Sequence, residues 1–288
     1  MKVSAIAPWF GSKRTLAPTI AQELGKHRAY WEPFCGGMSV LLNKPQVGHE
    51  TVNDLHGDLI NLARVIQDPQ LGPQLYRRLR RVVLHEDVLA EAWENLKATP
   101  MDESPLDRAF HYFVASWSGR NGFAGTTKVV GTKGIAVRWT PGGGHGGLRF
   151  ANAAASIPAW RRRMRRLTIL NRDGFDVIEK IDDTTGVAIY VDPPYLVKDA
   201  TYQHEFGDGF MTVGNDHERL AGLLGRFTRA RVVVSYYQHP ALATLYRGWT
   251  VRDCTMTKGI HNAGKRGQTG KKAPEVLLIN GPSYAEAS

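Results

Sequence analysis

The tetrapeptide Asp192-Pro193-Pro194-Tyr195 combines residue types that suit a flat ring bearing an amino group. The Asp192 carboxylate and the Pro193 carbonyl can accept both hydrogens of an exocyclic NH2 group, and the Tyr195 ring can stack on the face of the bound ring. The apolar run before it, residues 187–191, predicts a buried strand, so the tetrapeptide begins the loop that follows. Ligands of open α/β sheets bind beyond the carboxyl ends of the strands, so we expect a binding site here rather than a plain proline turn.

Residues 32–39, with the sequence Glu-Pro-Phe-Cys-Gly-Gly-Met-Ser, form a second candidate site. They close a predicted strand, and a helix opens directly after them at Val40. Glycines at such a turn let a ligand approach the backbone closely, although a purely structural turn is the commoner explanation. Asp54 ends the next predicted strand, where an acidic side chain commonly receives a ribose hydroxyl. Its alternative role is to cap the helix that follows.

Strands and helices have to position these segments, and the sequence predicts both. Short apolar or β-branched runs bounded by turn residues predict buried strands. They cover residues 30–34, 51–53, 167–170, 187–191, 232–235, 250–254 and 276–279. Apolar positions at three-to-four spacing predict helices between them, for example over residues 55–66 and 217–227. Strands that alternate with helices indicate an α/β fold with a mostly parallel sheet, covered by helices on both faces.

The middle of the chain is less regular and rich in arginine. Arginine clusters lie at residues 77–81 and 161–166. We expect this segment to be a mainly helical insertion with a small core of its own. The chain then divides into one discontinuous domain of residues 1–66 and 167–288 and an inserted domain of residues 67–166.

Composition restricts the class of protein. The chain has 288 residues and a formal net charge of +10, which suits a polyanionic partner, nucleic acid first and an acidic membrane second. No apolar run approaches the roughly 18 residues of a membrane span, and the apolar patch near the start is too short for a secretory signal. Cys35 and Cys254 are the only cysteines, and no histidine spacing suggests a metal site. We therefore expect a cytoplasmic protein with no metal and no membrane attachment.

Taken together, these motifs resemble those of the Dam-like (D12 class) family of DNA adenine-N6 methyltransferases. The family's N-terminal tryptophan–glycine–lysine motif is similar to residues 8–13, Pro-Trp-Phe-Gly-Ser-Lys. Its proline–phenylalanine–glycine motif is similar to residues 32–39, its strand-end acidic position to Asp54, and its catalytic tetrapeptide to residues 192–195. The order is the family's, and the variable recognition region falls in the arginine-rich insertion. Met38 departs from the pattern, which has a glycine there.

The resemblance implies the seven-stranded, Rossmann-like sheet of S-adenosylmethionine-dependent methyltransferases, S-adenosylmethionine as cofactor and double-stranded DNA as partner. The insertion would be the target-recognition domain of a protein that acts as a monomer. In the family pattern Asp54 binds the cofactor's ribose, Asp173 borders its adenine, and Asp192 lies between the cofactor and the target base. The other cofactor-binding residues implied are Trp9, Lys13, Pro33, Phe34, Gly36 and Ser39.

The reaction implied is direct methyl transfer to N6 of an adenine flipped out of the duplex, with Asp192, Pro193, Pro194 and Tyr195 as catalytic residues. Hydrogen bonds to the amino group would stabilise the positive charge that develops on the nitrogen. Residues 235–237 end another strand on the same face, where core packing is the favoured explanation and a border of the base pocket the alternative. A restriction-modification partner, a free-standing methylase and a phage enzyme are compatible biological roles.

Basic residues predict the surface that holds the DNA. Arginine clusters suit phosphate contacts, with a solvated helix face as the alternative. Arg120 and Asn121 are the residue types that read guanine and adenine edges, although local structural roles explain them as well. A glycine-containing basic stretch before the last strand is expected beside the DNA. The DNA-binding candidates are Arg120, Asn121, Arg161, Arg162, Lys265 and Arg266.

Three other functions fit parts of the pattern. Tetrapeptides of this kind also serve amino-methyltransferases that act on cytosine N4, on RNA bases or on protein glutamine. A non-catalytic DNA-binding protein that kept the fold is the second, and intact Lys13, Asp54 and Asp192 argue against it. An enzyme that uses a nicotinamide dinucleotide is the third, and it lacks support because no Gly-x-Gly-x-x-Gly follows the first predicted strand.

Overall fold

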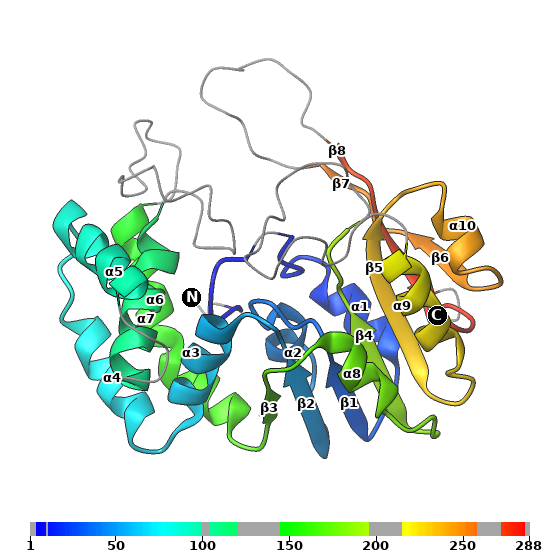
Figure 1. Cartoon of the computed structure of the whole chain (residues 1–288), viewed down its shortest axis with the longest axis horizontal. Helices are drawn as coiled ribbons and strands as arrows, with labels where there is room; N and C mark the ends of the chain where they lie inside the picture. Colours follow the sequence, from blue (N-terminus) through cyan, green and yellow to red (C-terminus); the bar gives the residue numbers. More distant parts are fainter. Residues whose placement is uncertain are drawn as a thin grey trace.

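The computed structural model describes residues 4–9, 11–98, 104–119, 145–195, 215–257 and 272–285. A seven-stranded sheet with the order β3-β2-β1-β4-β5-β9-β6 forms its centre (Figure 1). Neighbouring strands from β3 to β5 run parallel, whereas β9 is antiparallel to both β5 and β6. The strands are β1 (Ala29–Glu32), β2 (His49–Asn53), β3 (Thr168–Leu170), β4 (Val187–Val191), β5 (Arg231–Tyr237), β6 (Thr250–Asp253) and β9 (Glu275–Ile279).

Helices lie against this sheet and beside it. Helices α4 to α7 gather next to the β3 edge, on the left in Figure 1, and α9 and α10 lie toward the opposite edge. A short two-stranded ribbon of β7 (Met256–Thr257) and β8 (Lys272–Ala273) stands apart from the main sheet. The helices are α1 (Ala17–Leu24), α2 (Ser39–Asn43), α3 (Gly57–Gln67), α4 (Leu71–Arg80), α5 (Glu86–Ala98), α6 (Pro105–Ser118), α7 (Gly146–Met164), α8 (Gly174–Glu179), α9 (Asn215–Gly225) and α10 (Leu242–Leu245).

The sheet carries a hydrophobic core on each face. Along β4, Ala188 and Tyr190 belong to one buried cluster, and Ile189 and Val191 belong to the other. Successive side chains of a strand point to opposite faces, so the two clusters lie on opposite sides of the sheet. Helices α1 to α7 contribute to the first cluster, and α8 to α10 contribute to the second. The predicted coverage by helices on both faces is therefore confirmed.

The predicted α/β fold with a seven-stranded, mostly parallel sheet is also confirmed. Each of the seven predicted strands begins and ends within two residues of an observed strand, and so do the predicted helices over residues 55–66 and 217–227. The strands read as apolar runs because both of their faces are buried.

The helices between β2 and β3 do not enclose a separate core, which corrects that expectation. Leu75 of α4, Trp117 of α6 and Trp160 of α7 belong to the same buried cluster as Val52 of β2. The buried side chains of α6 are therefore continuous with the core on this face of the sheet. The division of the chain at residues 67–166 stays a prediction.

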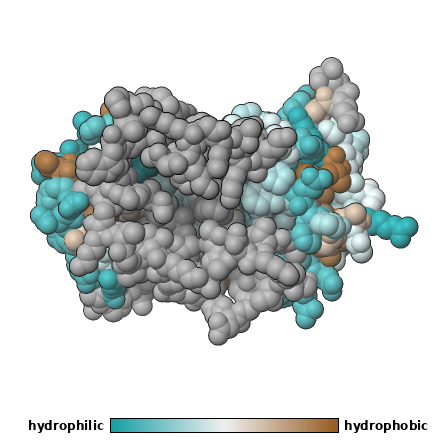
Figure 2. Space-filling model, turned by 90° about the horizontal axis from the view of Figure 1, so that it is seen from above, coloured by the Kyte–Doolittle hydropathy of each residue, from teal (hydrophilic) through white to brown (hydrophobic). Residues whose placement is uncertain are grey.

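The described part of the surface exposes few large apolar side chains. Hydrophilic residues predominate among the coloured atoms at both ends of the long axis in the view from above (Figure 2). The exposed large apolar side chains of the described residues, Val83, Leu148, Val251 and Tyr284, belong to separate elements and turns. Within the same residues, no helix is both long and apolar enough to cross a membrane.

Candidate functional site

A pocket lies where the strand order reverses, at the carboxyl ends of β1, β2 and β4. Its wall is formed by the segment before α1, the turn after β1, the start of the loop after β2 and the tetrapeptide after β4. Such a switch point is where open α/β sheets bind their ligands. The predicted site residues that line the pocket are Trp9, Lys13, Pro33, Phe34, Gly36, Ser39, Asp54, Asp192, Pro193 and Pro194.

The Asp192 carboxylate follows β4 directly and is held by three side chains. Its Oδ1 atom accepts hydrogen bonds from the Ser235 hydroxyl at 2.7 Å and the Tyr195 hydroxyl at 3.1 Å. Its Oδ2 atom lies 3.0 Å from the ammonium group of Lys13. The Asp192 side chain keeps 21% of its surface exposed, so the carboxylate faces the pocket while its orientation is set from behind.

Lys13 is the buried cation of the site, with only 3% of its surface exposed. Its ammonium group donates to the Gly11 carbonyl at 2.6 Å and lies 3.9 Å from Glu275 Oε1, in addition to its contact with Asp192. It also lies 4.9 Å from the centroid of the Tyr195 ring. A buried ammonium group needs acceptors to offset its lost hydration, and Lys13 has them on several sides.

Tyr195 is buried in this structure rather than presented to the pocket. It is 4% exposed, and its ring packs edge-on against Tyr237 with a centroid distance of 4.6 Å. Tyr236 lies behind it at 5.8 Å. Residues 235–237 therefore contact the tetrapeptide. Tyr236 packs in the core, as the favoured explanation predicted, whereas a border of the base pocket stays a prediction.

The turn after β1 is shaped by close packing as well as by its opening to the pocket. Gly36 has φ of 44°, and a Cβ atom there would lie 2.7 Å from the Trp9 ring. A Cβ atom on Gly37 would lie 2.6 Å from the Ala7 carbonyl oxygen. Met38, at the position where the family has glycine, adopts the left-handed conformation with φ of 59° and is completely buried. It is the one non-glycine residue of the described segments with a positive φ.

Asp54 ties the turn after β1 to the start of α3. Its Oδ2 atom accepts from the Gly36 amide at 2.8 Å, and its Oδ1 atom accepts from the His56 amide at 2.9 Å. The cap of α3 is His56, whose Nδ1 accepts from the Leu59 amide at 3.2 Å. The alternative role of Asp54 as this helix cap is therefore wrong. Burial raises the pKa of the Asp54 carboxyl, and the backbone bonds oppose that effect.

Glu32 is a pocket residue that the sequence analysis placed in a candidate segment without giving it a role of its own. It is 2% exposed, lines the pocket and accepts a hydrogen bond from the Tyr30 hydroxyl at 2.9 Å. Burial raises the pKa of its carboxyl to about 8, the negative charge of Asp192 adds to this rise, and the Tyr30 hydrogen bond opposes it. An acidic residue inside an apolar predicted strand, directly before Pro33, was the available signal.

Asp173 borders the pocket without lining it. Its Oδ1 atom accepts from the Phe175 amide at 2.8 Å, so it caps α8. The next residue, Gly174, does line the pocket, and a Cβ atom there would lie 2.5 Å from the Phe34 ring. The ring of Phe34 is thereby held against the start of α8.

The DNA-binding candidates divide into two groups. Arg120, Asn121, Lys265 and Arg266 lie outside the described residues. Arg161 and Arg162 lie in the last turn of α7, which leads directly into the start of β3. Because β3 runs parallel to β1, β2 and β4, its start lies at the amino-terminal ends of these strands, whereas Asp192 lies at their carboxyl ends.

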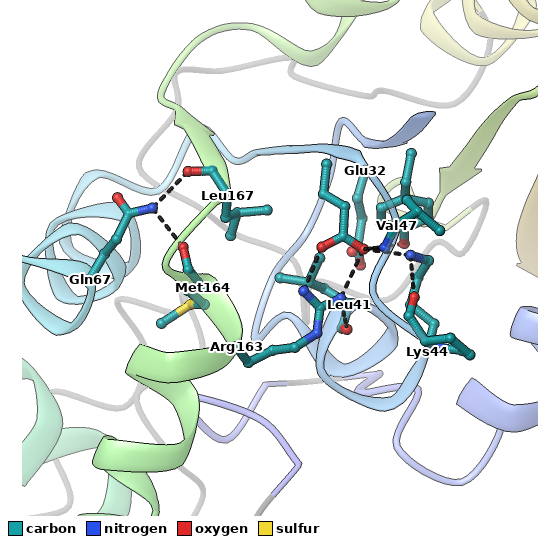
Figure 3. Close-up of polar contacts among 11 residues, drawn as sticks. Glu32, Leu41, Lys44, Val47, Gln67, Arg163, Met164 and Leu167 are labelled. Atoms are coloured by element: carbon teal, nitrogen blue, oxygen red, sulfur yellow. Dashed lines mark hydrogen bonds and ion pairs between the residues drawn. The ribbon is translucent and has the colours of Figure 1, made fainter. Parts of the chain in front are cut away.

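The neighbouring residues confirm this placement of the α7 terminus. Arg163 donates to the Glu50 carboxylate near the start of β2, at 2.5 and 2.9 Å, and to the Leu41 carbonyl (Figure 3). The side chain of Gln67 at the end of α3 donates to the Met164 and Leu167 carbonyls (Figure 3). The Arg161 guanidinium donates to backbone carbonyls between α3 and α4, and Arg162 is exposed.

Comparisons with known proteins agree with this geometry. The family model of the D12 class N6 adenine-specific DNA methyltransferases matches residues 9–260, which include the residues that line the pocket. No curated protein sequence matches the chain. In the described segments, no cluster of three or more His, Cys, Asp and Glu side chains is placed to hold a metal ion.

Proposed function

Because the chain belongs to the D12 class of N6 adenine-specific DNA methyltransferases, it is an enzyme that methylates adenine N6 in DNA, and we propose that Asp192 and the pocket beside it carry out this transfer with S-adenosylmethionine as donor. The observation that carries the proposal is the placement of the Asp192 carboxylate. It is oriented by three side chains and borders a pocket at the switch point of the sheet.

The residues of the pocket fit S-adenosylmethionine. Two carboxylates, those of Asp54 and Asp192, line it beside one ammonium group, that of Lys13, while the Glu32 carboxyl keeps its proton up to about pH 8. This balance suits a ligand that carries a sulfonium and an ammonium group. The Asp54 carboxylate lines the pocket and is oriented by backbone amides, so a ribose hydroxyl can approach it from the pocket.

The bound cofactor would supply an electrophilic methyl group on its sulfonium. The residues that we propose to hold it are two aromatic rings, one lysine, the acidic residues after three strands and the turn after β1. They are Trp9, Lys13, Pro33, Phe34, Gly36, Ser39, Asp54, Asp173 and Asp192.

Asp192 and Pro193 activate the target amine. The lone pair of an adenine amino group is delocalised into the ring, so the nitrogen is a weak nucleophile. Acceptors for both of its hydrogens favour the pyramidal geometry and stabilise the positive charge that grows on the nitrogen. Because Lys13, Ser235 and Tyr195 hold the carboxylate, it does not have to reorient during the reaction.

An adenine in a duplex cannot reach this carboxylate, so we propose that the target base is flipped out. The Tyr195 ring would then leave its contact with Tyr237 and stack on the base. Phosphate and base contacts outside the pocket are proposed for Arg120, Asn121, Lys265 and Arg266. We do not propose them for Arg161 and Arg162, because the last turn of α7 lies at the opposite ends of the strands from Asp192. We further expect a monomer with residues 67–166 as its target-recognition domain.

Product analysis tests the proposal. The purified protein is incubated with S-adenosylmethionine and unmethylated duplex DNA, and the nucleosides are identified by mass spectrometry. We expect N6-methyladenine, and we expect it to be absent with Asp192→Ala although that variant still binds the cofactor in calorimetry. Turnover by Asp192→Ala near the wild-type rate overturns the catalytic assignment. N4-methylcytosine overturns the target base, and no binding of S-adenosylmethionine overturns the cofactor.

A further inference from the structure

Ser235 contacts the reactive carboxylate from a neighbouring strand. In the parallel pairing of β4 with β5, Val191 lies opposite Val234, so the next residues along the two strands, Asp192 and Ser235, meet at the same edge. The Ser235 hydroxyl is 2.7 Å from Asp192 Oδ1, and Ser235 is completely buried. The contact is therefore set by strand register and not by a mobile loop.

A second hydroxyl fixes the direction of this hydrogen bond. The Tyr190 hydroxyl lies 2.9 Å from the Ser235 oxygen, and Tyr190 is 1% exposed. An ionised carboxylate can only accept, so the single hydroxyl hydrogen of Ser235 points to Asp192. Tyr190 must then donate to Ser235. The result is a buried chain of donors that runs from Tyr190 through Ser235 to Asp192.

The acceptor positions of the carboxylate show what this chain does. Each carboxylate oxygen accepts about two hydrogen bonds. Within the described residues, Oδ1 already accepts from Ser235 and from Tyr195, whereas Oδ2 contacts the ammonium group of Lys13 alone. The remaining acceptor position of the carboxylate therefore belongs to Oδ2.

We propose that Ser235 is a positioning residue of the methyl transfer, which occupies Oδ1 of Asp192 and thereby presents Oδ2 to the amino group of the target base. The inference rests on the proposed role of Asp192. It assigns to Ser235 no contact with base or cofactor. The Tyr190 hydroxyl supports it from one step further away, because it fixes the rotamer of the Ser235 hydroxyl.

A buried hydroxyl elsewhere in the chain provides a matched control. Ser283 donates to Glu23 Oε1 at 2.7 Å, the same type of bond at the same length, and Ser283 is 8% exposed. Glu23 also binds Arg231 at the start of β5. This pair therefore lies at the opposite end of the strand from Ser235 and Asp192. Ser283→Ala thus removes a comparable bond without touching the site.

The test measures the single-turnover rate of tritium transfer from labelled S-adenosylmethionine to duplex DNA from methylation-deficient cells, with enzyme in excess. We expect Ser235→Ala to lower this rate about tenfold and Tyr190→Phe to lower it about threefold, because the carboxylate loses its fixed orientation. The cofactor dissociation constant should stay within about twofold in both. Ser283→Ala should lower the melting temperature and leave the rate unchanged.

A conservative variant separates positioning from packing. Ser235→Thr keeps the hydroxyl, and we expect it to recover most of the rate even where its added methyl group lowers the melting temperature. A Ser235→Ala rate equal to wild type, or a Ser235→Thr rate as low as that of Ser235→Ala, overturns the inference. If Ser235→Ala does not fold, Tyr190→Phe and Ser235→Thr decide it. Absence of N6-methyladenine with the wild-type protein overturns the proposed function instead, before any variant is compared.

Discussion

The ammonium group of Lys13, which precedes the first helix, lies 3.0 Å from Oδ2 of Asp192, which follows the fourth strand. Two of the motifs recognised in the sequence therefore meet in one ion pair. This ion pair adjoins the proposed site of the target base, since Oδ2 of Asp192 also keeps the acceptor position that we propose for the target amine.

Replacing Lys13 by methionine should abolish most methyl transfer. Asp192 would lose the partner of its Oδ2 atom, and removing one member of a largely buried ion pair leaves the other charge uncompensated. We expect the single-turnover rate to fall by about tenfold or more. Lys13→Arg should not restore it, because a planar fork cannot replace a point charge among acceptors on several sides.

Lys44 is the control for that variant. It is 4% exposed, and its ammonium group lies 2.6 Å from Glu50 Oε1. It does not line the pocket, although its charge lowers the pKa of Glu32, which does. Like Lys13→Met, Lys44→Met removes one member of a buried ion pair and should reduce the free energy of unfolding. It should leave the rate of methyl transfer by the folded fraction unchanged. A Lys13→Met enzyme that transfers methyl groups at the wild-type rate would remove Lys13 from the mechanism.

Glu32 should make stability fall as pH rises. The folded protein holds its proton up to about pH 8, whereas the unfolded chain releases it near the ordinary value of 4.5. The folded state thus binds the additional proton between these values, and its stabilising effect, fully present below pH 4.5, is lost as pH rises through about 8. The slope is at most ~1.4 kcal/mol per pH unit.

Urea unfolding between pH 5 and 8.5 checks this. Glu32→Gln keeps a neutral acceptor for the Tyr30 hydroxyl and should flatten the slope, so that the variant gains stability over wild type as pH rises. Glu50→Gln is the matched control. Its carboxyl is also buried, but Arg163 and Lys44 overcome the burial and lower its pKa, so this variant loses stability without removing the slope. Equal slopes for wild type and Glu32→Gln contradict the raised pKa.

Met38 should prefer glycine over alanine among its small replacements. Its backbone is left-handed, which costs a non-glycine residue about 1 kcal/mol. Both variants lose the buried side chain at a cost of roughly 2–5 kcal/mol, but only glycine relieves the strain. We therefore expect Met38→Gly to be about 1 kcal/mol more stable than Met38→Ala.

Met164 provides the reference for this comparison. It is equally buried but lies in the right-handed conformation at the end of α7. The free energy of unfolding of Met164→Ala should therefore exceed that of Met164→Gly by about 1 kcal/mol. Chemical denaturation of the four variants gives both differences. The same order at both positions would show that the left-handed conformation of Met38 carries no cost.

The distribution of arginines predicts unequal effects on DNA binding. Arg162 lies near the amino-terminal ends of the parallel strands, whereas Asp192 lies at their carboxyl ends. Arg162→Ala should therefore change the affinity for a short duplex little. A residue that contacts a phosphate lowers the slope of log affinity against log salt by about 0.9 when it is removed. We expect that change for Lys265→Ala or Arg266→Ala. A full unit of slope lost with Arg162→Ala on a short duplex would place DNA against the far edge.

Much of the fold and the composition of the site could be read without the structure. Seven strands appeared as apolar runs because both faces of the sheet are buried, and that pattern is local. The strand ends that carry the site were recognisable because they directly follow these apolar runs. They are Asp54, residues 32–39 and Asp192. A parallel sheet places the carboxyl ends of its strands together, so a shared pocket followed from the elements alone.

Other relationships depended on which strands become neighbours and in what register. Ser235 reaches Asp192 only because β5 pairs with β4, and nothing in the sequence around Ser235 marks that partner. The antiparallel insertion of β9 between β5 and β6 is likewise invisible to local patterns. So is the position of Arg162, because the direction in which α7 crosses the molecule decides which edge of the sheet receives its last turn. Periodicity and residue type determined the elements and their chemistry, whereas long-range packing decided which side chains meet, since contacts between distant segments leave no trace in the spacing of either one.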